Sequence, residues 1–572
     1  MHDLVIRNGM VYDGSGRPGR RADVAIDGDR IVAVGTVDEP GRREIDTEGA
    51  AVTPGWVDVH THYDGQATWD PEVSPSGWHG VTTVVMGNCG VGFAPARPDE
   101  RDFLIQLMEG VEDIPGAALD EGMTWNWESF PEYLDELESM PRVLDVAALL
   151  PHGALRAYVL GSGRPNDEAT PGEIEEMARL AHEAAEAGAM GVSTTRTILH
   201  RAKDGELAAG TTAAFDELVA IGSALGGTGH RVFSVASDMA DPASEFDWMR
   251  QISLNADIPV TFQVLAVDFA PHWWRDWINR AMTANREEGA WLVPQVAGKP
   301  ASVLVGFEST FHPFVRNPEY RKIAKLPLDE RVERLRDPEV KAAILAAQPS
   351  EGAQGLDALM AASLSKLFPL NDPPNYEPDP STSVAAVAER EGRDPMEVTY
   401  ELMLQRDGKE LLYLPLLGYV NGGLDDIGEM LRHPGTVLGL GDGGAHCGVL
   451  CDASLPTFML THWARDRERG DTLSVEEVVH HQTRRTAMLY GFADRGLLEP
   501  GYLADVNVID LDGLRLEAPE MAYDLPAGGK RLIQRAQGYV ATVKSGVVVR
   551  EKDVATGERP GTLLRGAQPA PA

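Results

Sequence analysis

The chain has 572 residues, of which 43% are hydrophobic and 24% charged, as in an ordinary globular protein of about two or three domains. Asp and Glu outnumber Lys and Arg by 88 to 51, giving a formal net charge of −37. Nucleic acids and anionic membranes require basic surfaces, so this charge argues against both as partners. The sequence contains no apolar run of about 18 residues and no basic start followed by an apolar core, so we expect neither a membrane span nor a signal peptide. The three cysteines are too few for a disulfide framework and favour a reducing, cytoplasmic compartment.

Both ends of the chain have the pattern of short strands separated by turns. In residues 1–53, apolar runs alternate with Asn-Gly and Asp-Gly pairs, which is typical of β-hairpins. Residues 497–551 contain further strand candidates. Since the first sheet is too small to be stable alone, we expect these two segments to pair in one small β-sandwich domain. The tail, 552–572, is rich in Gly and Pro and is expected to be loosely ordered.

Between the two ends, short apolar strands alternate with helical patterns, which predicts an α/β fold with a parallel sheet. The expected strands are 57–59, 82–86, 143–150, 191–195, 232–235, 260–264, 291–296 and 437–440. A helix is expected over 171–187, where Thr170 can cap the first turn and Glu173 can complete a capping box. Eight such units predict a TIM (β/α)8 barrel over residues 54–496.

The connection between the seventh and eighth strands is far too long for a simple loop. Residues 298–436 therefore form an insertion. It begins at the C-terminal mouth of the barrel, where active sites of this fold lie. We expect either a lid or substrate-facing subdomain, or a plain surface elaboration.

Two histidines end the first barrel strand. His60 and His62 are separated by one residue, so on a strand their side chains point to the same face. Neutral imidazoles bind zinc and other transition metals. By itself, the pair also fits a merely polar strand end.

Two more candidate ligands follow other strands. Cys89 follows the second strand between glycines, and Asp442 follows the eighth. Parallel barrel strands end at one mouth, so these side chains and the histidine pair can form a zinc site. Asp442 is also expected to act as the general base that takes a proton from water. The alternatives are a small buried side chain in a tight turn for Cys89 and a turn cap for Asp442.

These motifs resemble those of the amidohydrolase superfamily, and more closely those of its N-acyl-D-amino-acid deacylase (D-aminoacylase) branch. The resemblance covers nearly the whole chain and implies a metal-dependent barrel hydrolase flanked by a composite β-sandwich. It also implies functional roles for His60, His62, Cys89 and Asp442. The motifs that carry it are PGWVDVHTHYD (54–64), GVTTV (80–84), GNCG (87–90), GDGGAH (441–446) and DRGLLEPGYLAD (494–505).

The sequence departs from the family pattern on three strands. The fifth strand carries no histidine, the sixth carries Gln263 where the family has histidine, and the fourth lacks the lysine of the binuclear branches. The metal site that remains is one divalent ion, expected to be Zn²⁺. Its expected ligands are His60, His62 and Asp442, with Cys89 as a further ligand.

Other polar side chains at strand ends are candidates for substrate contact. His152 is in the right place to polarise a carbonyl, and the group of Arg196, Arg201 and Lys203 would suit a substrate carboxylate. A solvated charge run is the alternative for that group, and a loop cap is the alternative for His446. Residues 295–299 are a further pocket candidate. The full set of expected substrate contacts is His152, Arg196, His200, Gln263 and His446.

Together these features predict a metal-dependent hydrolase of C–N bonds other than peptide bonds. The expected substrate is an N-acyl amino acid or a related small amide that bears a carboxylate. The alternatives are a hydrolase of a cyclic amide, hydantoin or carbamate, and a non-catalytic binding protein that has lost its metal histidines. Neither nucleic acid nor membrane is an expected partner, and assembly into a homo-oligomer is left open.

Overall fold

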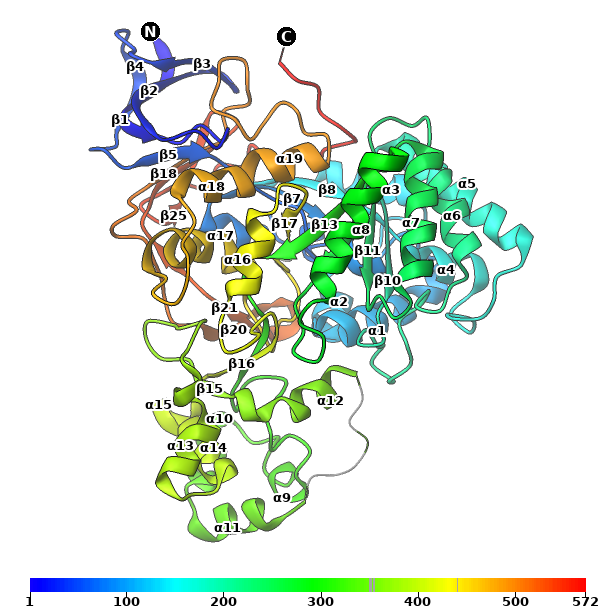
Figure 1. Ribbon diagram of the computed structural model, residues 1–572, viewed down its shortest axis with the longest axis vertical. Coiled ribbons are helices and arrows are strands. Elements are labelled where there is room, and N and C mark those ends of the chain that lie inside the picture. Colours follow the sequence, from blue (N-terminus) through cyan, green and yellow to red (C-terminus); the bar gives the residue numbers. More distant parts are fainter. Residues whose placement is uncertain (349–351, 353–354, 440, 572) are drawn as a thin grey trace.

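The computed structural model describes the chain except for residues 349–351, 353–354, 440 and 572. A β-sheet built from strands of both terminal segments lies at the upper left of Figure 1, the barrel lies in the middle, and a helical insertion forms the bottom. In the described part of the chain, no helix combines the length and the apolar character needed to cross a membrane.

The two ends of the chain share one nine-stranded sheet. β5 (Ala51–Pro54) pairs antiparallel with β18 (Val506–Ile509), which joins the N-terminal strands to the C-terminal ones. The expected pairing of the two ends is confirmed. The other strands are β1 (His2–Val11), β2 (Arg20–Asp27), β3 (Arg30–Gly35), β4 (Gly41–Asp46), β23 (Tyr539–Lys544), β24 (Val547–Glu551) and β25 (Val554–Ala555).

The barrel consists of parallel strands at the expected places. In order they are β6 (Trp56–Asp58), β7 (Val81–Met86), β8 (Asp145–Ala148) continued by β9 (Leu150–Pro151), β10 (Gly191–Arg196), β11 (Val232–Ser237), β12 (Val260–Val264), β13 (Leu292–Ala297) and β17 (Val437–Gly439). Leu440, expected to end the eighth strand, lies outside the described residues. The TIM (β/α)8 barrel with its composite β-sandwich is confirmed.

The barrel closes between its first and last strands, next to the expected metal ligands. The backbone N–H of Asp442 donates to the carbonyl of His60 (2.9 Å), and that of His62 donates to the carbonyl of Gly443 (2.8 Å). These bonds hold the ends of β6 and β17 side by side. Closure of the fold therefore fixes the spacing between the histidine pair and Asp442.

Helices cover the outside of the barrel (Figure 1). α5 (Pro171–Ala187) has the predicted bounds, and Thr170 and Glu173 form the predicted capping box. Met177 and Ala181 are buried one turn apart on the face that packs inward. The remaining helices are α1 (Arg101–Glu112), α2 (Gly116–Gly122), α3 (Phe130–Ser139), α4 (His152–Leu160), α6 (Phe215–Ser223), α7 (Pro242–Ala256), α8 (Trp273–Glu288), α16 (Asp425–Arg432), α17 (Leu455–Phe458), α18 (Val475–His480) and α19 (Thr486–Leu489).

The insertion has a sheet and a core of its own. β16 (Leu412–Leu417) pairs antiparallel with β14 (Ala301–Val305) and β15 (Phe368–Pro369), and Phe307 and Tyr400 lie in the core beside it. Its helices are α9 (Pro318–Arg321), α10 (Leu328–Leu335), α11 (Pro338–Ala346), α12 (Gly355–Ala362), α13 (Val384–Glu391), α14 (Pro395–Met403) and α15 (Gln405–Gly408). Some residues of the expected 298–436 insertion lie outside the described part of the chain.

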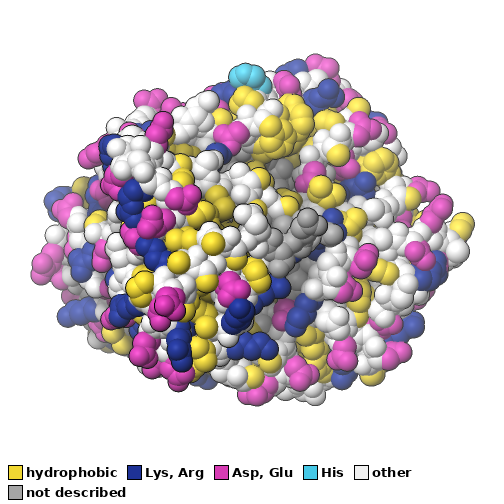
Figure 2. All heavy atoms as spheres, turned by 90° about the horizontal axis from the view of Figure 1, so that it is seen from below, with side chains coloured by type: hydrophobic (Ala, Val, Ile, Leu, Met, Phe, Trp, Pro, Cys, Tyr) yellow, Lys and Arg dark blue, Asp and Glu magenta, His cyan; other side chains and the backbone are white. Residues whose placement is uncertain are grey.

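Buried ion pairs fasten the insertion to the barrel. Glu377 of the insertion accepts from Arg467 (3.0 Å), and both side chains are at most 3% exposed. Lys299, where the insertion begins, pairs with Asp452 (2.5 Å). Buried pairs of this kind are costly to break because one charge is left without its partner. Figure 2 views the molecule from the insertion's end, and acidic and basic side chains are interspersed over this face.

The C-terminal tail is packed, which corrects the expectation of a loosely ordered segment. The N–H of Gly561 donates to the carbonyl of Arg142 (2.9 Å), and that of Leu564 donates to the carbonyl of Val146 (2.8 Å). Leu563 and Leu564 are at most 8% exposed. The tail runs along the edge of β8, where these leucines bury apolar surface and the backbone gains hydrogen bonds.

A hairpin from the C-terminal segment also reaches the insertion. β20 (Glu520–Leu525) and β21 (Gly529–Ile533) pair antiparallel, and the Tyr523 hydroxyl donates to Glu308 (2.7 Å). A smaller pair, β19 (Arg515–Leu516) and β22 (Ala536–Gln537), lies at its base. The C-terminal segment thus supplies strands to the nine-stranded sheet and also contacts the insertion.

Candidate functional site

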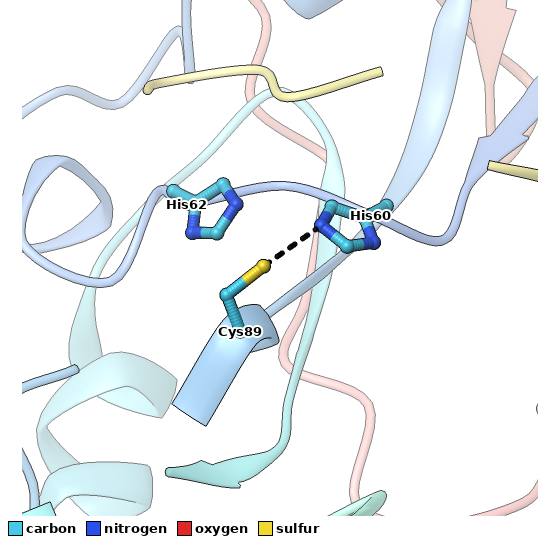
Figure 3. Close-up of side chains that lie close together, drawn as sticks. All are labelled: His60, His62 and Cys89. Carbon is cyan, nitrogen blue, oxygen red and sulfur yellow. Dashed lines mark hydrogen bonds between the residues drawn. The ribbon is translucent and has the colours of Figure 1, made fainter. Parts of the chain in front are cut away.

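Three of the expected metal ligands form one buried group. The ligand atoms of His60, His62 and Cys89 lie within 4.8 Å of one another, and each side chain is at most 7% exposed. His60 Nε2 is 3.5 Å from Cys89 Sγ (Figure 3). The end of β6 supplies the two imidazoles and the turn after β7 supplies the thiol, as the sequence predicted.

Asp442 completes this group from the last strand of the barrel. Its Oδ1 is 3.5 Å from His60 Nε2 and 3.7 Å from His62 Nε2. The structure therefore brings all four expected ligands together. His62 and Asp442 face each other across the seam that closes the barrel.

The backbone is strained at this site. Cys89, Asp442 and His446 all have positive φ angles, of 56°, 44° and 50°. A residue other than glycine in the left-handed region costs on the order of 1–3 kcal/mol and persists only where its surroundings enforce it. At Gly87, a Cβ would lie 2.4 Å from the carbonyl oxygen of Leu149, so no larger residue fits there. Residues strained in this way occur often at functional sites.

Each metal-site histidine has a polar side chain near its Nδ1 atom. His60 Nδ1 is 2.7 Å from Gln295 Oε1, and His62 Nδ1 is 3.3 Å from Glu112 Oε1. A proton held at Nδ1 leaves Nε2 with a free lone pair, which is how outer partners orient histidines that bind metal. In both rings Nε2 is the atom that approaches Asp442.

Burial and charge set the protonation of the site. Burial lowers the pKa of His60 to about 4, so its imidazole is neutral at pH 7. Burial would also lower the pKa of His62, but the Glu112 charge and the nearby Asp442 carboxylate hold it well above the usual value. Burial works against ionisation of Asp442 too, yet His62 and His60 hold its pKa well below the usual range. The surroundings of His62 therefore favour a positive charge.

These residues fit a divalent metal. Both ring nitrogens of His62 are buried and lack a hydrogen-bond partner among the described residues. Glu112 Oε1 lies near Nδ1 but is not aligned to accept a hydrogen bond from it. Buried polar atoms without a partner are rare in folded proteins and require an explanation. A cation bound at Nε2 would satisfy the imidazole. Imidazole, thiolate and carboxylate are the ligands that zinc sites use.

Three of the expected substrate contacts lie near this group. Gln263 Nε2 is 3.5 Å from Cys89 Sγ, and His446 Nε2 is 3.4 Å from Glu112 Oε2. Burial, together with the charges of His446 and His62, lowers the pKa of His200 to about 3. These three side chains border the metal-ligand group.

The other two expected contacts, His152 and Arg196, already have charged partners within the protein. His152 uses both ring nitrogens, at 2.9 Å from Thr194 Oγ1 and 2.8 Å from Glu217 Oε1, so it has none free to polarise a carbonyl. Arg196 is paired with Glu245 at 2.7 Å, so its charge is already balanced and does not await a substrate carboxylate.

Sequence reasoning overlooked Glu112. It ends α1 within the long connection from β7 to β8, where no motif marks it. Gln295 did carry a signal, because strand seven places it at the barrel mouth and residues 295–299 were pocket candidates. It lies directly opposite Gln263 on the neighbouring strand.

Comparisons with known proteins identify related enzymes. The D-aminoacylase of Alcaligenes xylosoxydans xylosoxydans is 39% identical over 193 residues, which is 34% of this chain and 37% of that enzyme's own length. The N-acyl-D-aspartate deacylase of the same organism is 27% identical over 570 residues, or 98% of this chain and 95% of that enzyme.

A solved structure shows the same fold. It is an N-acyl-D-glutamate deacylase from Bordetella bronchiseptica, complexed with zinc and a phosphonate inhibitor. At 22% identity it superposes with a TM-score of 0.63, covering 99% of this chain and 100% of that one. The family model described as "Amidohydrolase family" matches residues 43–550. The expectation of an amidohydrolase is thus confirmed, and the chain belongs to the amidohydrolase family.

Proposed function

We propose that the protein is a metal-dependent deacylase that hydrolyses the amide bond of small N-acyl amino acids. The observation that carries this proposal is the convergence of His60, His62, Cys89 and Asp442, with both His62 nitrogens unpartnered among the described residues. The names of the two relatives support the substrate class.

The same residues suggest one metal ion, which we propose to be Zn²⁺. The strand-five turn has no histidine and the strand-six position holds Gln263, a neutral amide that binds zinc poorly. His60, His62, Asp442 and Cys89 would hold the ion. When bound, a divalent metal supplies positive charge that polarises the amide carbonyl and acidifies water.

Asp442 is proposed to move the proton. Its carboxylate is ionised and 19% exposed, so water can reach it. It would accept a proton from the attacking water and pass it to the leaving nitrogen. His446 is 21% exposed and its Nε2 lies 3.4 Å from Glu112 Oε2, which suits contact with the substrate beside that proton path.

Arg196 and Lys299 cannot serve the substrate carboxylate without first losing their own carboxylate partners. We propose that polar groups at the rim, among them His200 and His446, contact it.

The free cysteines Cys89, Cys447 and Cys451 are all buried. Chains without a disulfide framework are typical of reducing compartments, and we propose a cytoplasmic location.

The proposal is tested by metal analysis combined with a substrate panel. We expect about one zinc per chain, loss of turnover on chelation and recovery with Zn²⁺. The panel should contain N-acyl-D-amino acids, their L-isomers, neutral amides and cyclic amides such as hydantoins. Preference for a cyclic amide would replace the proposed substrate, and a protein that binds metal and ligands without turnover would be a binding protein.

Asp442→Asn tests the proton role. At saturating zinc we expect kcat to fall by about 10²–10⁴-fold, because the amide cannot accept the proton. The matched control is Asp238→Asn, whose carboxylate accepts from the N–H of Ile198 (2.8 Å) at another strand end. We expect the control to retain kcat within about threefold. An equal loss in both variants would contradict a specific role for Asp442.

A further inference from the structure

The end of α1 carries a carboxylate that touches two histidines of the site. We infer that Glu112 is a positioning residue for both: its Oε1 orients His62 toward the metal, and its Oε2 orients His446 at the rim. This inference rests on the proposed function, because it assumes a metal at His62. It adds a residue for which neither the sequence motifs nor the four-ligand group assigns a role.

The surroundings of Glu112 support a role in the site. The side chain is 1% exposed, and its two oxygens lie 3.3 Å from His62 Nδ1 and 3.4 Å from His446 Nε2. A buried carboxylate is costly unless it is paired and hydrogen-bonded. Yet Oε2 and both His62 nitrogens have no aligned partner among the described residues. A purely structural ion pair would be expected to satisfy these atoms.

A bound metal accounts for this arrangement. An ion at Nε2 of His62 leaves the ring proton on Nδ1, the atom that faces Glu112. The carboxylate would hold the ring in place and make it a stronger metal ligand.

The backbone holds Glu112 and His446 together. The N–H of His446 donates to the carbonyl of Glu112, and the N–H of Gly448 donates to Asp113 Oδ2 (2.9 Å). The end of α1 is therefore fastened twice to the loop that follows β17. The same loop carries Asp442. Glu112 therefore lies where it can hold His62, a metal ligand, and His446, at the rim, in position at the same time.

The test is the zinc affinity of Glu112→Gln, measured with a chromogenic chelator as competitor. Glutamine keeps the size of the side chain but loses the charge. We expect zinc to bind about 10–100-fold more weakly, as is usual when an outer partner of a metal ligand is removed. The matched control is Glu109→Gln on the same helix, which breaks only the surface pair with Lys203 (2.7 Å). The control should bind zinc within about twofold of the wild type.

The outcomes separate the inference from the proposed function. If the wild type binds zinc and the E112Q variant binds it with the same affinity, the inference is overturned and the proposed function stands. A lower melting temperature with unchanged affinity also overturns the inference, because it marks Glu112 as structural. A wild type that binds no zinc overturns both. If E112Q does not fold, Glu112→Asp keeps the charge but falls short of both rings, and weaker zinc binding is expected again.

Discussion

The two sides of the barrel mouth use similar residues in opposite ways. On the side of β6, β7 and β17, His62 lies 3.3 Å from Glu112 and both its ring nitrogens lack an aligned partner among the described residues. On the side of β9 and β10, His152 is 2.8 Å from Glu217 and is bonded at both nitrogens. A buried histidine beside a glutamate therefore does not by itself identify a metal site.

The difference lies in what completes each pair. Glu217 also accepts from Arg156, so its charge is balanced within the protein. His152 and Arg156 hold the pKa of Glu217 below its usual value, although burial opposes this. Glu112 faces two imidazoles instead, in the region where the backbone is strained. Charged groups that have all their partners within the protein stabilise the fold. Groups that lack a partner can gain one when an ion binds.

The largest effect that this comparison predicts concerns the stability of the satisfied side. Glu217→Gln leaves Arg156, which is fully buried, without its carboxylate. Breaking a buried pair from one side costs about 3–5 kcal/mol, so we expect the free energy of unfolding to fall by that amount. Urea-induced unfolding of the metal-free protein measures it.

The control for this prediction is Glu176→Gln on α5, which breaks an exposed pair with Arg179 and should cost less than about 1 kcal/mol. The zinc affinity of Glu217→Gln should match that of the wild type. If it weakened as much as that of Glu112→Gln, the two sides would not be independent and the comparison would fail.

A smaller effect is expected at Gln295 on β13, whose side chain is the outer partner of His60. Gln295→Ala removes the acceptor that lies 2.7 Å from His60 Nδ1, so we expect zinc to bind about tenfold more weakly. The matched variant is Gln263→Ala, opposite it on β12, which loses only a 3.5 Å contact with Cys89. Chelator competition should show a change of no more than about threefold for that variant. A larger loss for Gln263 than for Gln295 would mean that the thiolate, not His60, depends on its outer partner.

Much of the fold followed from local patterns in the sequence. Strand positions could be predicted because each barrel strand is a short apolar run, and α5 because Thr170 and Glu173 form a capping box. The tail was predicted wrongly because Gly and Pro obscured Leu563 and Leu564, whose burial depends on a distant strand edge. Composition describes local preference, whereas packing depends on what the segment meets.

The site was predictable only where ligands end strands. The His60 and His62 pair, Cys89 and Asp442 carry that signal, since parallel strands end at one mouth. Glu112 lacked it because a helix end can approach the mouth from any direction. His152 has the same signal as the ligands, yet its partner Glu217 lies 65 residues away on α6. Sequence alone cannot show whether such a histidine is already satisfied.

The smallest predicted effect is on how the stability of the protein depends on pH. It arises from His152, on the side of the barrel mouth formed by β9 and β10. Burial lowers the pKa of His152 although Glu217 opposes this, so below about pH 6.5 His152 binds fewer protons in the folded protein than in the unfolded chain. The stabilisation from neutral His152 is therefore present above that pH and lost as the pH falls below it. His152→Gln should lose less stability than the wild type between pH 7 and 5.5, measured from urea midpoints. His182→Gln, on an exposed side chain, should follow the wild type. If the stability of His152→Gln fell with pH as steeply as that of the wild type, protonation of His152 would cost the folded protein no stability. The surroundings of His152 would then be less rigid than its two hydrogen bonds imply.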